Sequence, residues 1–236
     1  AMTTGGESTT VGITGSAAVN HIKGNTASLL ENNKINNAKN IDVLSANIGS
    51  QIATGLGLKV DTTKEGLEIA GSGSVNLIDQ SASAKLKNNI INANEQNNTN
   101  QTDIDVLAYT DDLQVTGGVS VNFAKKANAI GASVSFADVK NNVEAAIEQG
   151  EHKNIKDVNV TAGFNATQIS TAVGVAISTN ENALNGAFVY NHLDNKVQSN
   201  IKDTHISQSG HTHLNVGTLT AEQYQHTRDD TQSLNT

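Results

Sequence analysis

The sequence predicts an all-β fold, a right-handed parallel β-helix, from three observations: an internal repeat, apolar residues that alternate at period 2, and an unusual composition. The chain has 236 residues, among them 31 Asn and 20 Gly but no Pro, Cys or Trp, and only 3% are aromatic. With so few aromatic side chains, a core has to be built from Val, Ile, Leu and Ala.

A short glycine-led segment marks the repeat. Gly15-Ser16-Ala17-Ala18-Val19-Asn20 recurs as Gly71-Ser72-Gly73-Ser74-Val75-Asn76, and more loosely at Gly131 and Gly186, so the four glycines are 56, 60 and 55 residues apart. A second landmark, Ile41-Asp42-Val43-Leu44, recurs at 104–107 and in worn form at 156–159 and 213–216. A period of this length predicts a repeat architecture in which each unit stacks on its neighbours.

A third landmark predicts strands. Segments 51–60, 114–123 and 168–177 align without a gap, and in each the apolar side chains share one parity while residues such as Gly55, Gly57 and Lys59 occupy the other. The apolar set is Ile52, Leu56, Leu58 and Val60, then Val115, Val119, Val121 and Phe123, then Ile169, Val173, Val175 and Ile177. Period 2 is typical of a strand with one buried face, and we expect this apolar set to face inward.

The remaining piece of each unit, such as 30–35 and 86–90, predicts a strand with a bend, because paired Asn residues interrupt it and Asn favours turns. Strand starts near Ser16, Lys34, Ala53 and Ser72 are 18 or 19 residues apart. We therefore expect coils of about 19 residues, with three coils in each repeat unit of about 56. Asn side chains stacked inside the coil or at its bends can then form hydrogen-bonded ladders.

Charge and composition exclude several functions. With 15 Lys+Arg against 23 Asp+Glu, the net charge of −8 makes nucleic acid a poor partner. Apolar runs such as 173–177 are far shorter than the roughly 20 residues that span a bilayer, so we expect no membrane insertion. The absence of Cys excludes a disulfide framework and any thiolate site.

Domain organisation follows from the extent of the repeats. We expect residues 3–221 to form a single β-helix segment of a longer protein, preceded by a cloning remnant at 1–2 that shows no signal-peptide pattern. Residues 222–236 are expected to be an irregular tail or the start of the next coil.

Two stretches resemble a known family. They are Thr26 to Leu30 followed by Ile35 to Val43, and Asp157 to Ala162 leading to the strand Gln168 to Ile177. They resemble the leukotoxin-like repeats of large filamentous surface adhesins and autotransporters, best known from fusobacteria, and the likeness covers about residues 10–221. The resemblance implies a β-helical passenger region, type V secretion through the outer membrane, a cell-surface location, and an adhesive or cytotoxic parent protein. It supplies no site residue.

Several residues could form a site, and each also has a structural explanation. His205, His211 and His213 are the densest group of possible metal ligands, but no further ligand completes the set, so we expect a solvated face and no metal or cofactor. Two acidic series recur once per repeat and are interpreted as turn residues about 14 Å apart, too far for one active site. These series are Asp42, Asp105 and Asp157, and Asp79, Asp138 and Asp194.

The glycine pairs and the single Arg also have structural explanations. The Gly55-Leu56-Gly57 and Gly117-Gly118 segments lack the following helix of a phosphate loop, and we expect close backbone approach there. Arg228, the one Arg, lies in the aperiodic tail, away from any acidic series.

The sequence therefore predicts a non-enzymatic structural or adhesive segment of a secreted or surface-anchored bacterial adhesin. Its expected partner is a ligand on host cells or other bacteria, and the isolated chain is expected to be a monomer. One alternative is a carbohydrate-active β-helix such as a polysaccharide lyase or depolymerase, which needs acids and a basic residue on one face. A trimeric adhesin head is a third reading, but it requires a period near 14 that the sequence does not show.

Overall fold

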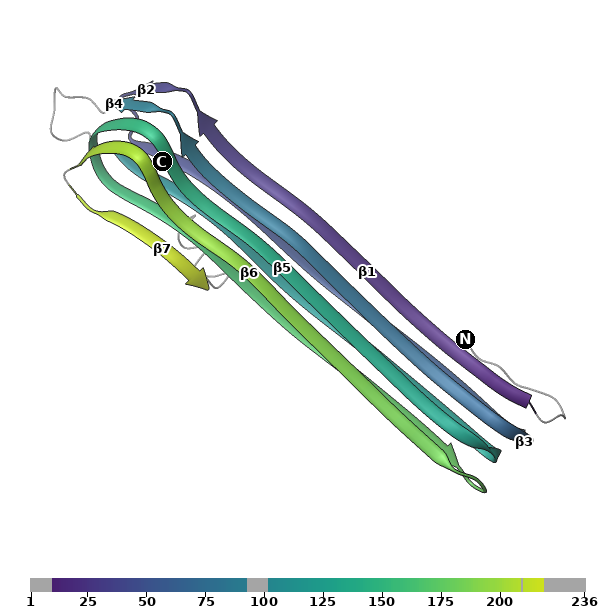
Figure 1. Ribbon diagram of the computed structural model, residues 1–236. Helices are drawn as coiled ribbons and strands as arrows, with labels where there is room; N and C mark the ends of the chain where they lie inside the picture. Colours follow the sequence, from purple (N-terminus) through teal and green to yellow (C-terminus); the bar gives the residue numbers. More distant parts are fainter. Residues whose placement is uncertain (1–9, 93–101, 209, 219–236) are drawn as a thin grey trace.

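A computed structural model describes residues 10–92, 102–208 and 210–218 of the chain, and these residues are almost entirely β-strand (Figure 1). The expected boundaries at 1–2 and 222–236 lie outside the described residues. The strands form one sheet, and the pairings between these described strands are all parallel, which confirms the all-β, parallel prediction. They are β1 (Thr10–Glu31), β2 (Lys34–Asn36), β3 (Asn40–Lys87), β4 (Ile90–Asn92), β5 (Thr102–Ser178), β6 (Ala183–Gln208) and β7 (Thr212–Thr218).

The strand register follows the sequence repeat, except that the glycine landmark at Gly131 is one residue out of register: Gly71 pairs with Ala132, and Gly131 pairs with Asn185. Ile22 of β1 pairs with Ile78 of β3, Ile78 pairs with Val139 of β5, and Val139 pairs with Leu193 of β6. These steps are 56, 61 and 54 residues long, so equivalent positions of successive repeats stack directly on one another. This open parallel sheet is consistent with a β-solenoid, in which each unit hydrogen-bonds to the unit before and after it.

The expected coil of about 19 residues, with three coils per repeat, is wrong, because partners in register lie 53 to 63 residues apart. Ser16 pairs directly with Ser72, whereas Lys34 begins the short strand β2 and Ala53 lies on the returning part of the chain. The 18- and 19-residue intervals therefore separate successive segments within one repeat. Periodicity along a chain does not by itself distinguish these segments from stacked neighbours.

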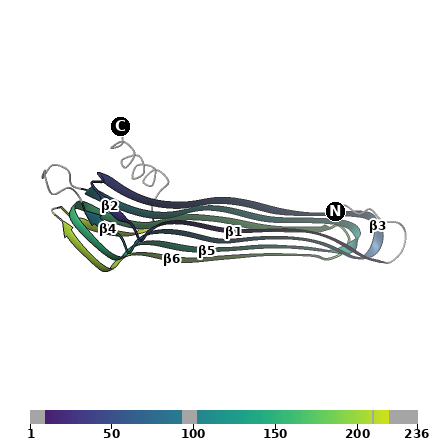
Figure 2. The same cartoon turned by 90° about the horizontal axis from the view of Figure 1, so that it is seen from above.

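Each repeat runs along the molecule and back again, giving an elongated, flat shape (Figure 2). We call residues 10–31, 66–87, 127–148 and 183–202 leg A, and residues 40–61, 103–124, 157–178 and 212–218 leg B. Side chains bridge the two legs of one repeat: Asn20 Nδ2 donates to Ile52 O at 2.8 Å, and Ser45 Oγ donates to Thr26 O at 3.1 Å. At about 3.3 Å per residue, a 22-residue leg is roughly 70 Å long.

Polar residues in left-handed backbone geometry turn the chain from leg A to leg B. Asn32, Asn88, Gln149 and Asp203 occupy the same position of four successive repeats, with φ of 59°, 50°, 53° and 50°. Asn tolerates this region better than most residues, and Asn88 Nδ2 donates to Asn32 Oδ1 at 2.6 Å. The strand breaks at 32–33 and 88–89 confirm the predicted bends, and this contact is one rung of the expected Asn ladder.

The interior changes character along the legs. Near these turns an apolar core of Ile, Val, Leu and Ala joins both legs, with Leu86, Ile104 and Ile147 fully buried. Tyr109 is also fully buried, but it packs with Leu107 in a separate cluster, on the opposite face of the strand from Ile104, Val106 and Ala108.

Toward the opposite end the interior contains mainly Gly, Ala, Ser, Asn and Gln. There the backbones of the two legs approach closely, and a Cβ on Gly57 would lie 2.3 Å from Gly71 O.

The expected inward face of leg B is also reversed. Ile52 and Leu56 are 68% and 62% exposed, whereas Gly55, Gly57 and Lys59 of the other parity are buried. Because the two backbones are so close, only small or extended polar side chains fit between them. The β-branched residues of this segment therefore face outward, the opposite of what hydrophobicity alone predicts.

Candidate functional site

An exposed row of aromatic rings lies on the outer face of leg A, and we call Phe136, Phe188, Tyr190 and His192 the aromatic strip. The Phe136 and Tyr190 rings stack with centroids 4.8 Å apart and planes inclined by 12°. The Tyr190 and His192 rings follow at 6.4 Å. Phe188 is 57% exposed and Tyr190 41% exposed, so both rings present apolar surface to solvent.

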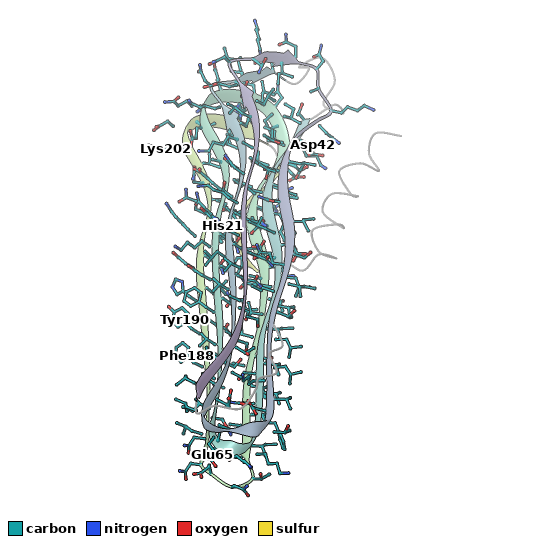
Figure 3. The ribbon with its side chains drawn as sticks, turned by 90° about the vertical axis from the view of Figure 1, so that its right-hand side faces the viewer. His21, Asp42, Glu65, Phe188, Tyr190 and Lys202 are labelled. Atoms are coloured by element: carbon teal, nitrogen blue, oxygen red, sulfur yellow. The ribbon has the colours of Figure 1, made fainter. Side chains whose placement is uncertain are left out.

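The strand alternation and the register together build this strip. Phe188, Tyr190 and His192 are every second residue of β6, so all three point to the same side. The 54-residue step places Phe136 of β5 directly beside Tyr190. Figure 3 shows Phe188 and Tyr190 near each other on one side of the ribbon, pointing away from it.

Charged groups border the strip. His192 Nδ1 lies 2.9 Å from Asp138 Oδ1, and Lys140 Nζ lies 3.7 Å from Asp138 Oδ2. The combination of flat rings with a carboxylate, an imidazole and an ammonium group suits recognition by stacking and hydrogen bonding.

The three predicted histidines do not come together as one group. His211 and His213 share a strand face, with ring centroids 6.1 Å apart, and His211 N–H donates to Asp157 Oδ1 at 2.8 Å. His205 instead pairs in register with Glu151. Among the residues that the structure describes, no three His, Cys, Asp or Glu side chains gather closely enough to hold a metal ion.

The first acidic series lies closer together than expected. Asp42 and Asp105 are partners in register on adjacent strands, about 5 Å apart rather than 14 Å, because one repeat rather than three coils separates them. Burial, followed by repulsion from Asp105 and Asp103, raises the pKa of Asp42. Burial also raises the pKa of Asp105, although the Asn159 amide donates to it at 2.9 Å. The backbone N–H of His211 donates a hydrogen bond to Asp157 and lowers the pKa of that carboxyl.

The second acidic series does not form one column. Asp79 and Asp194 both lie beside Lys140 in the register, whereas Asp138 lies beside His192. Each of these carboxylates therefore has a cationic or imidazole neighbour, so the three do not act as one acidic site.

The predicted close backbone approach is confirmed at Gly55 and Gly57, where a Cβ would lie 2.5 Å from Gly73 O and 2.3 Å from Gly71 O. At Gly118 a Cβ would lie 3.0 Å from the backbone oxygen of Val134 and 2.6 Å from the side-chain oxygen of Ser133. The prediction does not hold at Gly117, where the nearest atom is 3.6 Å away. Arg228 lies outside the described residues.

Two titratable side chains are buried away from the aromatic strip. Burial raises the pKa of Asp112 to about 6, even though the Asn141 amide lowers it. Burial lowers the pKa of His152 to about 4. Both side chains are 1% exposed and belong to the interior of the stack.

These two shifts act on stability in opposite directions. The raised pKa of Asp112 contributes stability that is present below about pH 4 and is lost as the pH rises to about 6. The lowered pKa of His152 contributes stability above about pH 6.5 that is lost as the pH falls to about 4. As the pH falls from 6.5 to 4, we expect the free energy of unfolding of His152→Gln to rise relative to wild type by up to about 3 kcal/mol. Over the same range, that of Asp112→Asn should fall relative to wild type by up to about 3 kcal/mol. Urea unfolding at several pH values measures both, and parallel profiles for the three proteins would contradict the assignment.

Comparison with known proteins finds no match to a family model, a curated protein or a solved structure. No helix in the described part of the chain is long and apolar enough to cross a membrane.

The sequence pattern alone did not predict the aromatic strip. Val134 and Phe136 share one parity, as do Phe188 and Tyr190, but the 55-residue spacing of the glycine landmark places Phe136 opposite Asn191 rather than Tyr190. Without the register, however, nothing indicated that the two segments adjoin or that this parity faces outward.

Proposed function

We propose that this chain is a structural and adhesive segment of a secreted or surface-exposed bacterial adhesin. The aromatic strip, held on a long stack of parallel strands, is the observation that carries the proposal. In this proposal the chain is a right-handed β-helix with one turn per repeat, since parallel β crossovers strongly prefer that hand. The ligand is a surface molecule of a host cell or of another bacterium.

The chemistry of the strip supports a binding role. Exposed apolar patches rimmed by polar groups commonly mark interaction sites, and tyrosine is enriched among the residues that dominate binding energy. Phe188 and Tyr190 lie on rigid strands, so little conformational entropy is lost when a ligand packs on them. The resemblance to filamentous adhesins supports the same role and is the basis for the proposed surface location.

A flat strip of a few rings gives a weak contact, so binding is expected to depend on many copies. We expect beads that carry many copies of the chain to adhere to host or bacterial cells, and Phe188→Ala with Tyr190→Ala to reduce adhesion about tenfold or more. Ile52→Ala is a matched control, because Ile52 is an apolar side chain 68% exposed on the outer face of leg B. Bead retention on cell layers measures the effect.

Two results would contradict parts of this proposal. Adhesion that survives the double substitution unchanged would exclude the aromatic strip as the binding surface. No adhesion in any multivalent format would leave only a spacer role, in which the stack separates a distal binding site from the cell.

One observation favours the second candidate, a carbohydrate-active β-helix. The register brings Asp103, Asp105 and Asp157 onto one face, and Lys156 Nζ lies 3.8 Å from Asp103 Oδ2 and 3.4 Å from Asp157 Oδ2. A lyase or depolymerase needs such acids with a basic group. New unsaturated or reducing ends from acidic polysaccharides, abolished by Asp105→Asn, would favour this function over adhesion.

A further inference from the structure

Among residues 10–92, 102–208 and 210–218, the strand stack presents an open strand edge at each end. Within the described residues, β1 pairs only with β3 and β6 pairs only with β5, so one long edge of each has no strand partner. A strand edge carries unpaired N–H and C=O groups that can pair with another chain. Because all pairing is parallel, the edge of β6 has the polarity needed to continue onto the edge of a β1 strand.

A column of alternating charge runs across leg A from one edge to the other. Lys23, Asp79, Lys140 and Asp194 are successive partners in register, from β1 to β6. Lys23 Nζ lies 3.5 Å from Asp79 Oδ2 within the stack. The column begins with a cation on β1 and ends with an anion on β6, so the two edges are complementary at this position.

A second column alternates with the opposite sign. Glu31, Lys87, Glu148 and Lys202 are successive partners, and Lys87 Nζ lies 3.0 Å from Glu31 Oε1. This column begins with an anion on β1 and ends with a cation on β6. The two edges are therefore complementary at both positions in one common register, with residues 12–31 of β1 opposite 183–202 of β6.

The apolar core is open at the same edges. Leu30, Leu86, Ile147 and Ile201 form one column, in which the inner two are fully buried and the outer two only half-buried. A hollow of about 440 Å³ lies at the β1 end, between the two legs of the first repeat. Its lining residues are Ser28, Leu29, Leu30, Asp42, Val43 and Leu44.

We propose that two copies of this chain associate head to tail, with the β6 edge of one copy pairing in parallel with the β1 edge of the next. Lys23 then lies beside Asp194 of the neighbouring copy and Glu31 beside Lys202, while Ile201 covers Leu30. The contact is heterologous, so association can continue beyond the dimer. It departs from the monomer expected from the sequence. Phe188, Tyr190 and His192 of the aromatic strip lie on β6 itself, so the contact also places Ala17, Val19 and His21 of the neighbouring copy beside them. The disulfide test below measures the strand register and does not depend on adhesion.

Engineered cysteines test the geometry, since the natural chain has none. Ala27 and Gln198 fall opposite each other in the proposed register, at a Cα separation of about 5 Å, which suits a disulfide. Equal amounts of the Ala27→Cys and Gln198→Cys proteins are mixed and oxidised. As an out-of-register control, Ala17→Cys replaces Ala27→Cys. Circular dichroism of each protein confirms that it is folded.

We expect the Ala27→Cys and Gln198→Cys proteins to form mixed disulfide at least about tenfold faster than the control pair, because association raises the effective concentration of the thiols. Sedimentation of the wild-type chain should show larger species as concentration rises. Equal rates for the two pairs, disulfides mainly between identical chains, or a single monomeric species at every concentration would each overturn the proposal.

Discussion

Gly57→Ala is expected to lower the free energy of unfolding by about 2–3 kcal/mol, whereas Gly73→Ala should change it by less than about 0.5 kcal/mol. A Cβ on Gly57 would lie 2.3 Å from the carbonyl oxygen of Gly71 and 2.9 Å from its carbon, so the two legs would have to separate. A Cβ on Gly73 would meet nothing within 4 Å. Urea unfolding of both variants measures the difference.

The pair also tests which parity of leg B faces inward. Both glycines lie in strand β3, so the effect of Ala on backbone freedom is similar at the two positions and largely cancels in the comparison. Similar effects at the two positions would show that the legs do not approach closely at Gly57. In that case the apolar set around Ile52 and Leu56 would be free to face inward, as the alternation alone predicts.

Lys59→Met is expected to destabilise the protein by about 3–5 kcal/mol, because it leaves the Glu68 carboxylate buried without its cation. Lys59 Nζ lies 2.9 Å from Glu68 Oε2, and the two side chains are only 6% and 1% exposed. Gly12 makes room for the pair, since a Cβ there would lie 2.1 Å from the same carboxylate oxygen. Thermal or urea unfolding measures the loss.

Two controls isolate the cause. Combining Lys59→Met with Glu68→Leu removes both charges and should recover most of the lost stability. Lys23→Met removes an exposed pair, in which the side chains are 74% and 51% exposed, and should cost less than about 1 kcal/mol. A double variant no more stable than Lys59→Met alone would show that packing, rather than the uncompensated charge, causes the loss.

The candidate site was less predictable than the fold. The landmarks at Gly131 and Gly186 are 55 residues apart, so they place Phe136 opposite Asn191 rather than Tyr190. Stacking of the two rings, however, depends on a 54-residue register that becomes visible only when the strands are paired. The same register places Asp42 beside Asp105. The expected distance of about 14 Å between them was wrong because it assumed three coils in each repeat.

The sequence by itself determined the strand class, the repeat of about 56 residues and the bends at Asn32 and Asn88, because these follow from local alternation, spacing and the turn preference of Asn. The tertiary structure decided how large each turn is and which parity faces inward. Period 2 assigns side chains to two faces but does not say which face is buried. That choice depends on the distance between the two legs, and where Gly57 lies against Gly71 the gap admits no branched side chain, so Ile52 and Leu56 face outward.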